Sequence, residues 1–287
     1  MQELTLKLPV RYYRRGGVDW RTGRLDAKSA GEFVKEITLT TKNTAITIMH
    51  GAVREFGRPG RSGLENYFSD WRSRQSEVIE QHIAPLFQKA RKAGIRILYN
   101  MAGYERIHAH PNYTMINNLA IRALADKPDT VQGPPDAAFG YCADKAKDLW
   151  RDSVGCSASE LSGYFTATQY PESISPRPED WVAEETVQSA AVFREHGIGN
   201  LLMTGFDACG CLMTTAGGLL HMAPLGYRCV IVEDCVEAAE APWTREGKRV
   251  KACMLKTMQL FGMCGIIHSN AILKALEDAG KPGERTI

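Results

Sequence analysis

The feature that most constrains the fold is a strand–helix–strand pattern in the first third of the chain. The apolar run TAITIM at residues 44–49 predicts a buried strand, and IRILYNM at residues 95–101 predicts a second one. Between them, residues 76–94 carry apolar side chains at helical spacing, with Ser76 as the N-cap and Gly94 at the C-terminal stop. A helix that joins two short apolar strands is typical of a parallel sheet.

The same alternation returns in the second half of the chain. It predicts, in order, a helix, strand, helix, strand, helix, strand and helix at residues 186–197, 200–204, 211–224, 227–233, 244–262, 265–269 and 270–279. We therefore expect a three-layer, doubly wound α/β fold of the Rossmann type, in which helices cover both faces of a mostly parallel sheet. Ligands of such folds bind at the carboxyl ends of the strands.

The remaining segments show no such alternation. Residues 1–43 are interpreted as an N-terminal arm that packs on the body or on a neighbouring subunit, and residues 44–287 as a single domain. The Gly- and Arg-rich residues 51–75 are interpreted as a loop. Residues 102–180 are punctuated by Pro and Gly, with one helix expected over residues 136–152.

Composition narrows the functional classes. Of the 287 residues, 44% are apolar and 24% charged, as in ordinary globular proteins, and the formal net charge of +2 gives no reason to expect nucleic acid or a membrane as a partner. The N-terminal residues lack the apolar core of a signal peptide, so the eight cysteines are expected to be reduced thiols in a cytoplasmic protein. The two cysteines of CGC have no second pair at zinc-site spacing, and we expect a small-molecule substrate but no metal or cofactor.

The stretch TGFDACGC, residues 204–211, lies between a predicted strand and a predicted helix. Cys211 falls on the first helical turn, where the helix dipole favours the thiolate and free N–H groups can hold an oxyanion. Cys209 lies in the preceding loop and lacks this placement. Placement alone leaves Cys211 open between a chemical role and simple packing, whereas the apolar contexts of the other cysteines predict packing: Cys229, Cys235, Cys253 and Cys264.

The segment GIGNLLMTGFDACGCLMTTAGGLLHMAPLGYRCVIVEDCVEA, residues 197–238, resembles the signature of the isochorismatase-like cysteine hydrolases. The resemblance implies a hydrolase that breaks a C–N bond of a small amide or carbamoyl compound through a thioester acyl-enzyme. It places the nucleophile on Cys211 and the oxyanion-holding N–H groups on Asp207 and Cys211. It also implies a cis peptide bond before Asp207 and a homodimer or homotetramer.

The sequence departs from the family at two positions. The Asp expected after the first strand is His50, and the expected Lys is Glu185, or Glu184 in an alternative register. In one interpretation Cys211, His50 and Glu185 form a rebuilt triad, in which imidazole takes the thiol proton and a carboxylate orients the ring. In the other, the site has diverged and the chain is a non-hydrolytic binding protein. We favour the first because the nucleophile turn is intact.

Three further residues are candidates for the wall of the substrate pocket: His108, Tyr104 and Phe56. His108 and His110 also raise the alternative of a bound metal, as in zinc-containing amidases of this family. The Asp-x-His part of their zinc motif is absent here. A solvated loop is the other interpretation of the two histidines.

Overall fold

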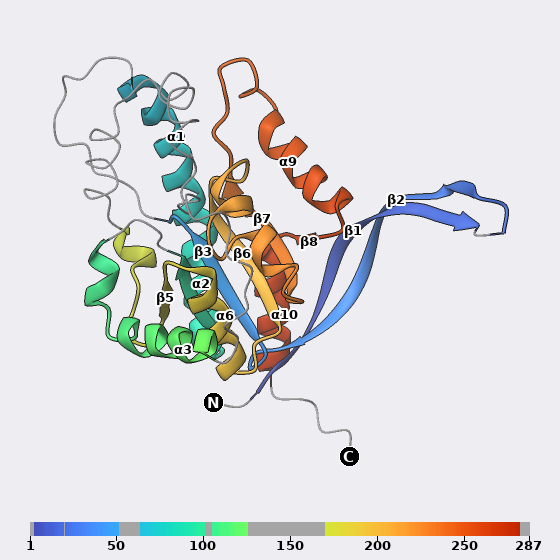
Figure 1. The fold of residues 1–287 in the computed structure, drawn as a ribbon. Helices are drawn as coiled ribbons and strands as arrows, with labels where there is room; N and C mark the ends of the chain where they lie inside the picture. The colour runs from blue at the N-terminus through green and yellow to red at the C-terminus, as the bar shows by residue number, and fades with distance from the viewer. Residues whose placement is uncertain (1–2, 20, 52–63, 101–104, 126–169, 282–287) are drawn as a thin grey trace.

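The computed structural model describes residues 3–19, 21–51, 64–100, 105–125 and 170–281 (Figure 1). The helix predicted over residues 136–152 lies outside the described residues. None of the helices in the described ranges combines the length and apolar character that crossing a bilayer requires.

The centre of the molecule is an eight-stranded sheet with the strand order β2-β1-β8-β7-β6-β3-β4-β5. Strands β3 to β8 run parallel to one another, which confirms the predicted mostly parallel α/β sheet. Their bounds are Thr44–Met49 for β3, Arg96–Asn100 for β4, Trp181–Ala183 for β5, Asn200–Phe206 for β6, Arg228–Glu237 for β7 and Cys264–Ile267 for β8.

Central strand β3 shows why the sheet needs helices on both faces. All six of its residues are buried. Ile46 and Ile48 belong to one hydrophobic cluster and Ala45 and Met49 to another, because successive side chains of a strand point to opposite faces. A strand that is apolar on both sides is stable only where both sides are covered.

The two helical layers supply this cover (Figure 1). One layer contains α1 (Leu64–Val78), the π-helical turn η1 (Ile79–Ile83), α2 (Ala84–Lys92) and α10 (Ser269–Gly280). The other contains α3 (Tyr113–Ala125), α6 (Thr186–Glu195), α7 (Cys211–Thr214), α8 (Leu219–Met222) and α9 (Arg249–Leu260).

Several predicted boundaries are wrong. The first helix begins at Leu64 rather than Ser76, so the predicted loop is helical from Leu64 onward. Trp71 and Val78 of this helix are buried in the core. This packing outweighs the preference of Ser76 for an N-cap position, so Ser76 lies inside the helix. The predicted helix 211–224 is divided into α7 and α8, and α3 is an additional helix without a predicted counterpart.

Residues of the predicted N-terminal arm form a long antiparallel hairpin from β1 (Thr5–Asp19) and β2 (Arg24–Thr40). Its base joins the sheet where Arg11 pairs with Ile266 of β8, and it places Leu6, Leu8 and Leu39 in the core. Its outer part extends away from the body (Figure 1). Contact of this outer part with a second copy of the chain stays a prediction.

Candidate active site

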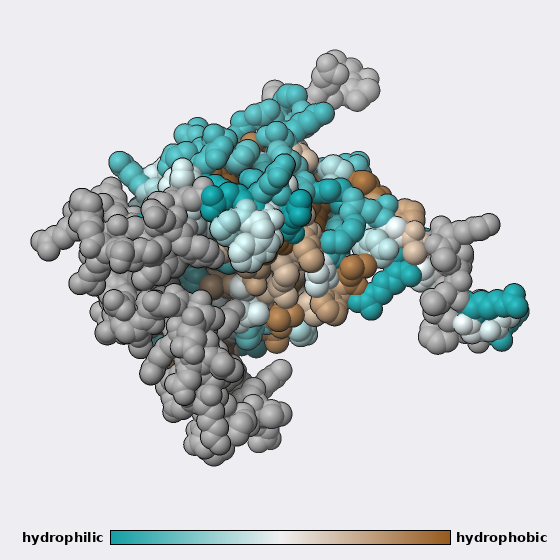
Figure 2. Space-filling model, turned by 90° about the horizontal axis from the view of Figure 1, so that it is seen from above, coloured by the Kyte–Doolittle hydropathy of each residue, from teal (hydrophilic) through white to brown (hydrophobic). Residues whose placement is uncertain are grey.

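The carboxyl ends of the parallel strands bring most of the predicted site residues to one edge of the sheet. His50 follows β3, Glu184 follows β5, and Asp207 follows β6. Seen from above, the described surface has hydrophobic residues at its centre, with hydrophilic residues around them (Figure 2). This arrangement agrees with the rule that ligands of parallel α/β sheets bind at the carboxyl ends of strands.

A tight turn connects β6 to the helix that begins at Cys211. The peptide bond between Phe206 and Asp207 is cis, as the sequence resemblance implies. The Asp207 carbonyl oxygen accepts hydrogen bonds from Gly210 N at 3.1 Å and Leu212 N at 3.0 Å. These bonds close the turn and start α7 at Cys211.

The Cys211 sulfur is surrounded by hydrogen-bond donors. The backbone N–H groups of Asp207 and Cys211 and the hydroxyl of Thr215 all donate toward it. Burial and the charge of Asp207 nevertheless outweigh these donors and raise the thiol pKa above its ordinary value, which corrects the expectation of a lowered pKa. Thr215 was not a sequence candidate, because nothing in the motif marks the residue four positions after a nucleophile.

The Asp207 carboxylate fixes the same turn from the other side. Its Oδ1 atom accepts hydrogen bonds from Cys209 N and Ala239 N, both at 3.1 Å. Its Oδ2 atom accepts the Cys209 thiol proton at 3.0 Å. Burial and this carboxylate raise the pKa of Cys209 to about 12, so Cys209 is a protonated thiol at neutral pH. The sequence assigned Asp207 only a backbone role.

A buried ionic cluster lies directly behind the turn. Glu237, at the end of β7, is fully buried, and its carbonyl oxygen accepts a hydrogen bond from Ala208 N at 2.9 Å. Its carboxylate contacts Lys248 Nζ at 2.8 Å and Arg74 Nη1 at 3.3 Å, with Lys251 Nζ at 3.9 Å. Cations from α1 and from the start of α9 therefore hold the end of β7 beside the turn of residues 207–211.

His50 follows the last residue of β3 and has a left-handed backbone conformation, with φ of 46°. Its backbone N–H donates to Asn100 O at 3.4 Å across the end of β4. Burial lowers the pKa of its imidazole to about 4, so the ring is neutral at pH 7.

The two glutamates of the predicted triad have other contacts. Glu184 accepts the Tyr113 hydroxyl proton at 2.9 Å, and both of its carboxylate oxygens lie 3.1 Å from His108 Nε2. Glu185 precedes α6, its backbone N–H donates to Gln188 Oε1 at 3.0 Å, and burial raises the pKa of its carboxyl. The structure thus brings His108 and Glu184 together, and the triad of Cys211, His50 and a glutamate stays a prediction.

The remaining candidates have different outcomes. The His108 side chain is about half exposed, and its place in the wall of the substrate pocket stays a prediction. Tyr104 and Phe56 lie outside the described residues. Within the described ranges, no group of three or more His, Cys, Asp or Glu residues is arranged to hold a metal ion.

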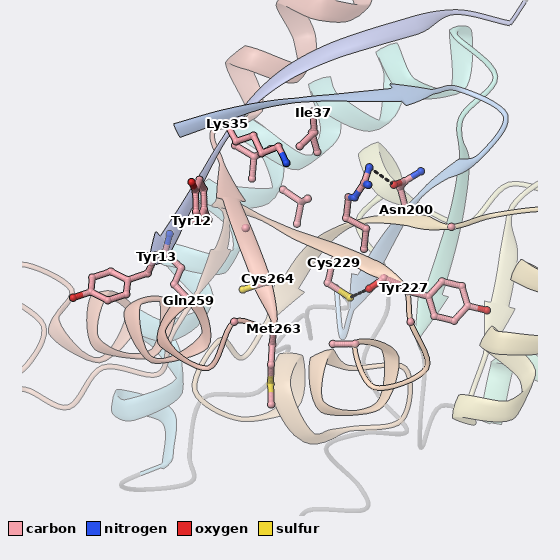
Figure 3. A pocket seen from close by; sticks show the side chains of 18 of the residues that line it. Tyr12, Tyr13, Lys35, Ile37, Asn200, Tyr227, Cys229, Gln259, Met263 and Cys264 are labelled. Carbon is pink, nitrogen blue, oxygen red and sulfur yellow. Dashed lines mark hydrogen bonds between the residues drawn. The ribbon is translucent and has the colours of Figure 1, made fainter. Parts of the chain in front are cut away.

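A groove of about 790 Å³ lies at the opposite end of the sheet. Side chains of the hairpin, among them Tyr12 and Lys35, form one wall, and residues at the amino ends of β6 and β7 form another (Figure 3). Arg228 donates to Asn200 Oδ1 at 3.3 Å within it. Because it lies at the amino ends of the strands, this groove is separate from the nucleophile turn.

No protein-family model matches the sequence, and no curated protein matches it. Several solved structures are similar to this chain. The cysteine hydrolase from Pseudomonas syringae pv. phaseolicola 1448A is 16% identical, with a TM-score of 0.52 over 84% of this chain and 95% of that chain. An isochorismatase family protein from Desulfovibrio vulgaris subsp. vulgaris str. Hildenborough is 16% identical, with a TM-score of 0.45 over 82% of this chain and 98% of that one. The first similarity shows that the chain shares the fold of that cysteine hydrolase.

Proposed function

We propose that this chain, which has the isochorismatase-like fold, is a cysteine-dependent hydrolase of a C–N bond in a small amide or carbamoyl compound. The observation that carries the proposal is the convergence of two backbone N–H groups, those of Asp207 and Cys211, on the Cys211 sulfur. Donors in that position can hold the oxyanion that forms when the sulfur attacks a carbonyl carbon. The solved structure with the same fold from Pseudomonas syringae pv. phaseolicola is itself described as a cysteine hydrolase.

The proposed reaction has two halves. Cys211 loses its thiol proton and attacks the carbonyl carbon, and the carbonyl oxygen becomes an oxyanion held by the two N–H groups. The C–N bond then breaks, the leaving nitrogen takes a proton, and a thioester remains on Cys211. Water attacks the thioester and releases the acid and the free thiol. His50 is the predicted proton carrier, since a neutral imidazole can accept the thiol proton and return it to the nitrogen.

A panel of small primary amides, carbamoyl amino acids and ureas tests the proposal through release of ammonia or amine. We expect at least one compound to be hydrolysed, with activity lost in Cys211→Ala and largely kept in Cys209→Ala. The second variant is a matched control, because the two cysteines share one turn. Activity that disappears in Cys209→Ala and survives in Cys211→Ala would move the nucleophile by two residues.

A non-hydrolytic binding protein is the second candidate, and the raised pKa of Cys211 favours it. A thiol that remains protonated at neutral pH is a poor nucleophile without a base. Binding of a panel compound, measured by calorimetry, with no product and no acyl-enzyme would establish this alternative.

A further inference from the structure

We propose that Asp207 is a positioning residue for Cys211: its carboxylate fastens the turn of residues 207–211 to the end of β7 and places a negative charge beside the cysteines of that turn. This inference rests on the proposed role of Cys211 as the nucleophile. It goes beyond that role because it assigns a function to a side chain whose backbone alone was expected to take part.

The contacts of the carboxylate show what it fastens. Oδ1 bridges Cys209 N in the turn and Ala239 N, two residues beyond the last residue of β7. Oδ2 accepts the thiol proton of Cys209. Together with the hydrogen bond from Ala208 N to Glu237 O, this bridge joins the ends of β6 and β7 beyond their last paired residues. The turn it holds presents the Asp207 and Cys211 N–H groups to the sulfur.

The same contacts favour the ionised form of the carboxylate. Burial raises the pKa of the Asp207 carboxyl, and the hydrogen bonds from the Cys209 thiol and from the N–H groups of Cys209 and Ala239 oppose this by favouring the charged form. Glu237, the neighbouring buried acid, contacts the cations Arg74 and Lys248. The hydrogen-bond partners of Asp207 carry no charge, so its negative charge acts on the adjacent thiols.

Other charged and titratable groups lie on the elements around the two cysteines and also contribute to the electrostatic potential there. Glu237 lies on β7 with its cations from α1 and the α9 region, His50 follows β3, Glu185 precedes α6, and His221 lies on α8. Of these acids, Asp207 is the one whose charge raises the pKa of both Cys209 and Cys211. A negative charge beside a thiol disfavours the thiolate, so the resting nucleophile is held in its unreactive form.

The test is the pH dependence of Cys211 alkylation by iodoacetamide, followed on the full chain by peptide mapping with fragmentation. Cys253 on α9 is exposed, which corrects the expectation that it packs in an apolar environment, and it serves as an internal reference in every sample. In the wild type we expect Cys253 to be labelled first at pH 7, and Cys211 only as the pH rises. Asp207→Asn keeps a carbonyl oxygen for Cys209 N and Ala239 N but removes the charge. It should move the Cys211 midpoint down by about one pH unit, which corresponds to roughly tenfold more thiolate at a given pH.

Glu195→Gln is the control, since it removes an exposed carboxylate at the C-terminal end of α6 that has no role in the proposed site, and it should leave the Cys211 midpoint unchanged. A midpoint that is the same in the wild type and Asp207→Asn overturns the proposal. Asp207→Ser provides a second neutral variant if the first folds poorly, and the same midpoint shift is expected there. Alkylation needs no substrate, so a chain that hydrolyses no amide still answers the question. Failure of the proposed hydrolase function and failure of the proposed role of Asp207 would therefore give different results.

Discussion

Gly205 of β6 lies so close to Met49 of β3 that a Cβ atom on Gly205 would approach the Met49 carbonyl oxygen to 2.1 Å. Gly205 also has a φ of 105°, a backbone conformation that residues with a side chain rarely adopt. The two residues are paired in the parallel ladder immediately before the cis peptide bond and the nucleophile turn. Close approach of the two central strands therefore sets where the turn begins.

Substitution of Gly205 by Ala should be severely destabilising. The added methyl group meets main-chain atoms that cannot rotate away, and the positive φ adds strain. We expect a loss of at least about 3 kcal/mol in the free energy of unfolding, measured by urea denaturation. Gly199→Ala is the control, because a Cβ there meets nothing within 4 Å, and it should stay within about 0.5 kcal/mol of the wild type. Equal stabilities for the two variants would contradict the predicted clash.

The ionic cluster behind the turn gives a second prediction. Glu237→Ala should cost about 3–5 kcal/mol of stability, because it leaves the mostly buried Arg74 and Lys251 side chains without their carboxylate. Glu36→Ala removes an exposed partner of Lys7 and should cost less than about 1 kcal/mol. Thermal or urea unfolding of both variants measures the difference. A Glu237→Ala protein as stable as Glu36→Ala would refute this account of the cluster.

Burial of His50 predicts how stability depends on pH. The pKa of His50 is lowered from 6.5 to about 4 in the folded chain, so between these values the unfolded chain binds a proton that the folded chain does not. The free energy of unfolding should therefore fall as the pH falls through this window, by roughly 3 kcal/mol from this group. His50→Gln should remove that part of the pH dependence, whereas His196→Gln, at an exposed position, should retain it. Identical pH profiles for wild type and His50→Gln would disprove the lowered pKa.

The predicted base function of His50 is tested separately by activity. If His50 carries the thiol proton, His50→Ala should lower kcat by about 10²–10⁴-fold on a compound that the wild type hydrolyses. The contacts of Glu184 with His108 and Tyr113 suggest a parallel comparison with His108→Ala. Near-normal turnover in His50→Ala would contradict the rebuilt triad. A larger loss of kcat in His108→Ala than in His50→Ala would assign the proton transfer to the pair of His108 and Glu184.

Much of the parallel sheet could be predicted from the sequence. The bounds of β3 follow directly from TAITIM, in which four of the six residues are apolar, and all six are buried. The cis peptide bond before Asp207 was also within reach, since the resemblance around residues 197–238 implied it, whereas the role of Cys211 as the nucleophile stays a prediction.

Other features depend on tertiary contacts that leave no local pattern. Helix α1 begins at Leu64, before the predicted N-cap Ser76, and its Trp71 packs edge-to-face on Phe206 of β6, with the ring centroids 6.0 Å apart. The hydroxyl of Thr215, the residue after α7, donates to the Cys211 sulfur. The pairing of Glu184 with His108 joins residues 76 positions apart, which spacing along the chain cannot reveal.

The most direct test of the central claim is the location of the acyl group during turnover. An amide that the chain hydrolyses is mixed with the protein, the reaction is quenched with acid, and the thioester is mapped by fragmentation mass spectrometry. The account predicts an acyl adduct on Cys211 that persists in Cys209→Ala and is absent from Cys211→Ala. An adduct on Cys209, or continued hydrolysis by Cys211→Ala, would contradict it.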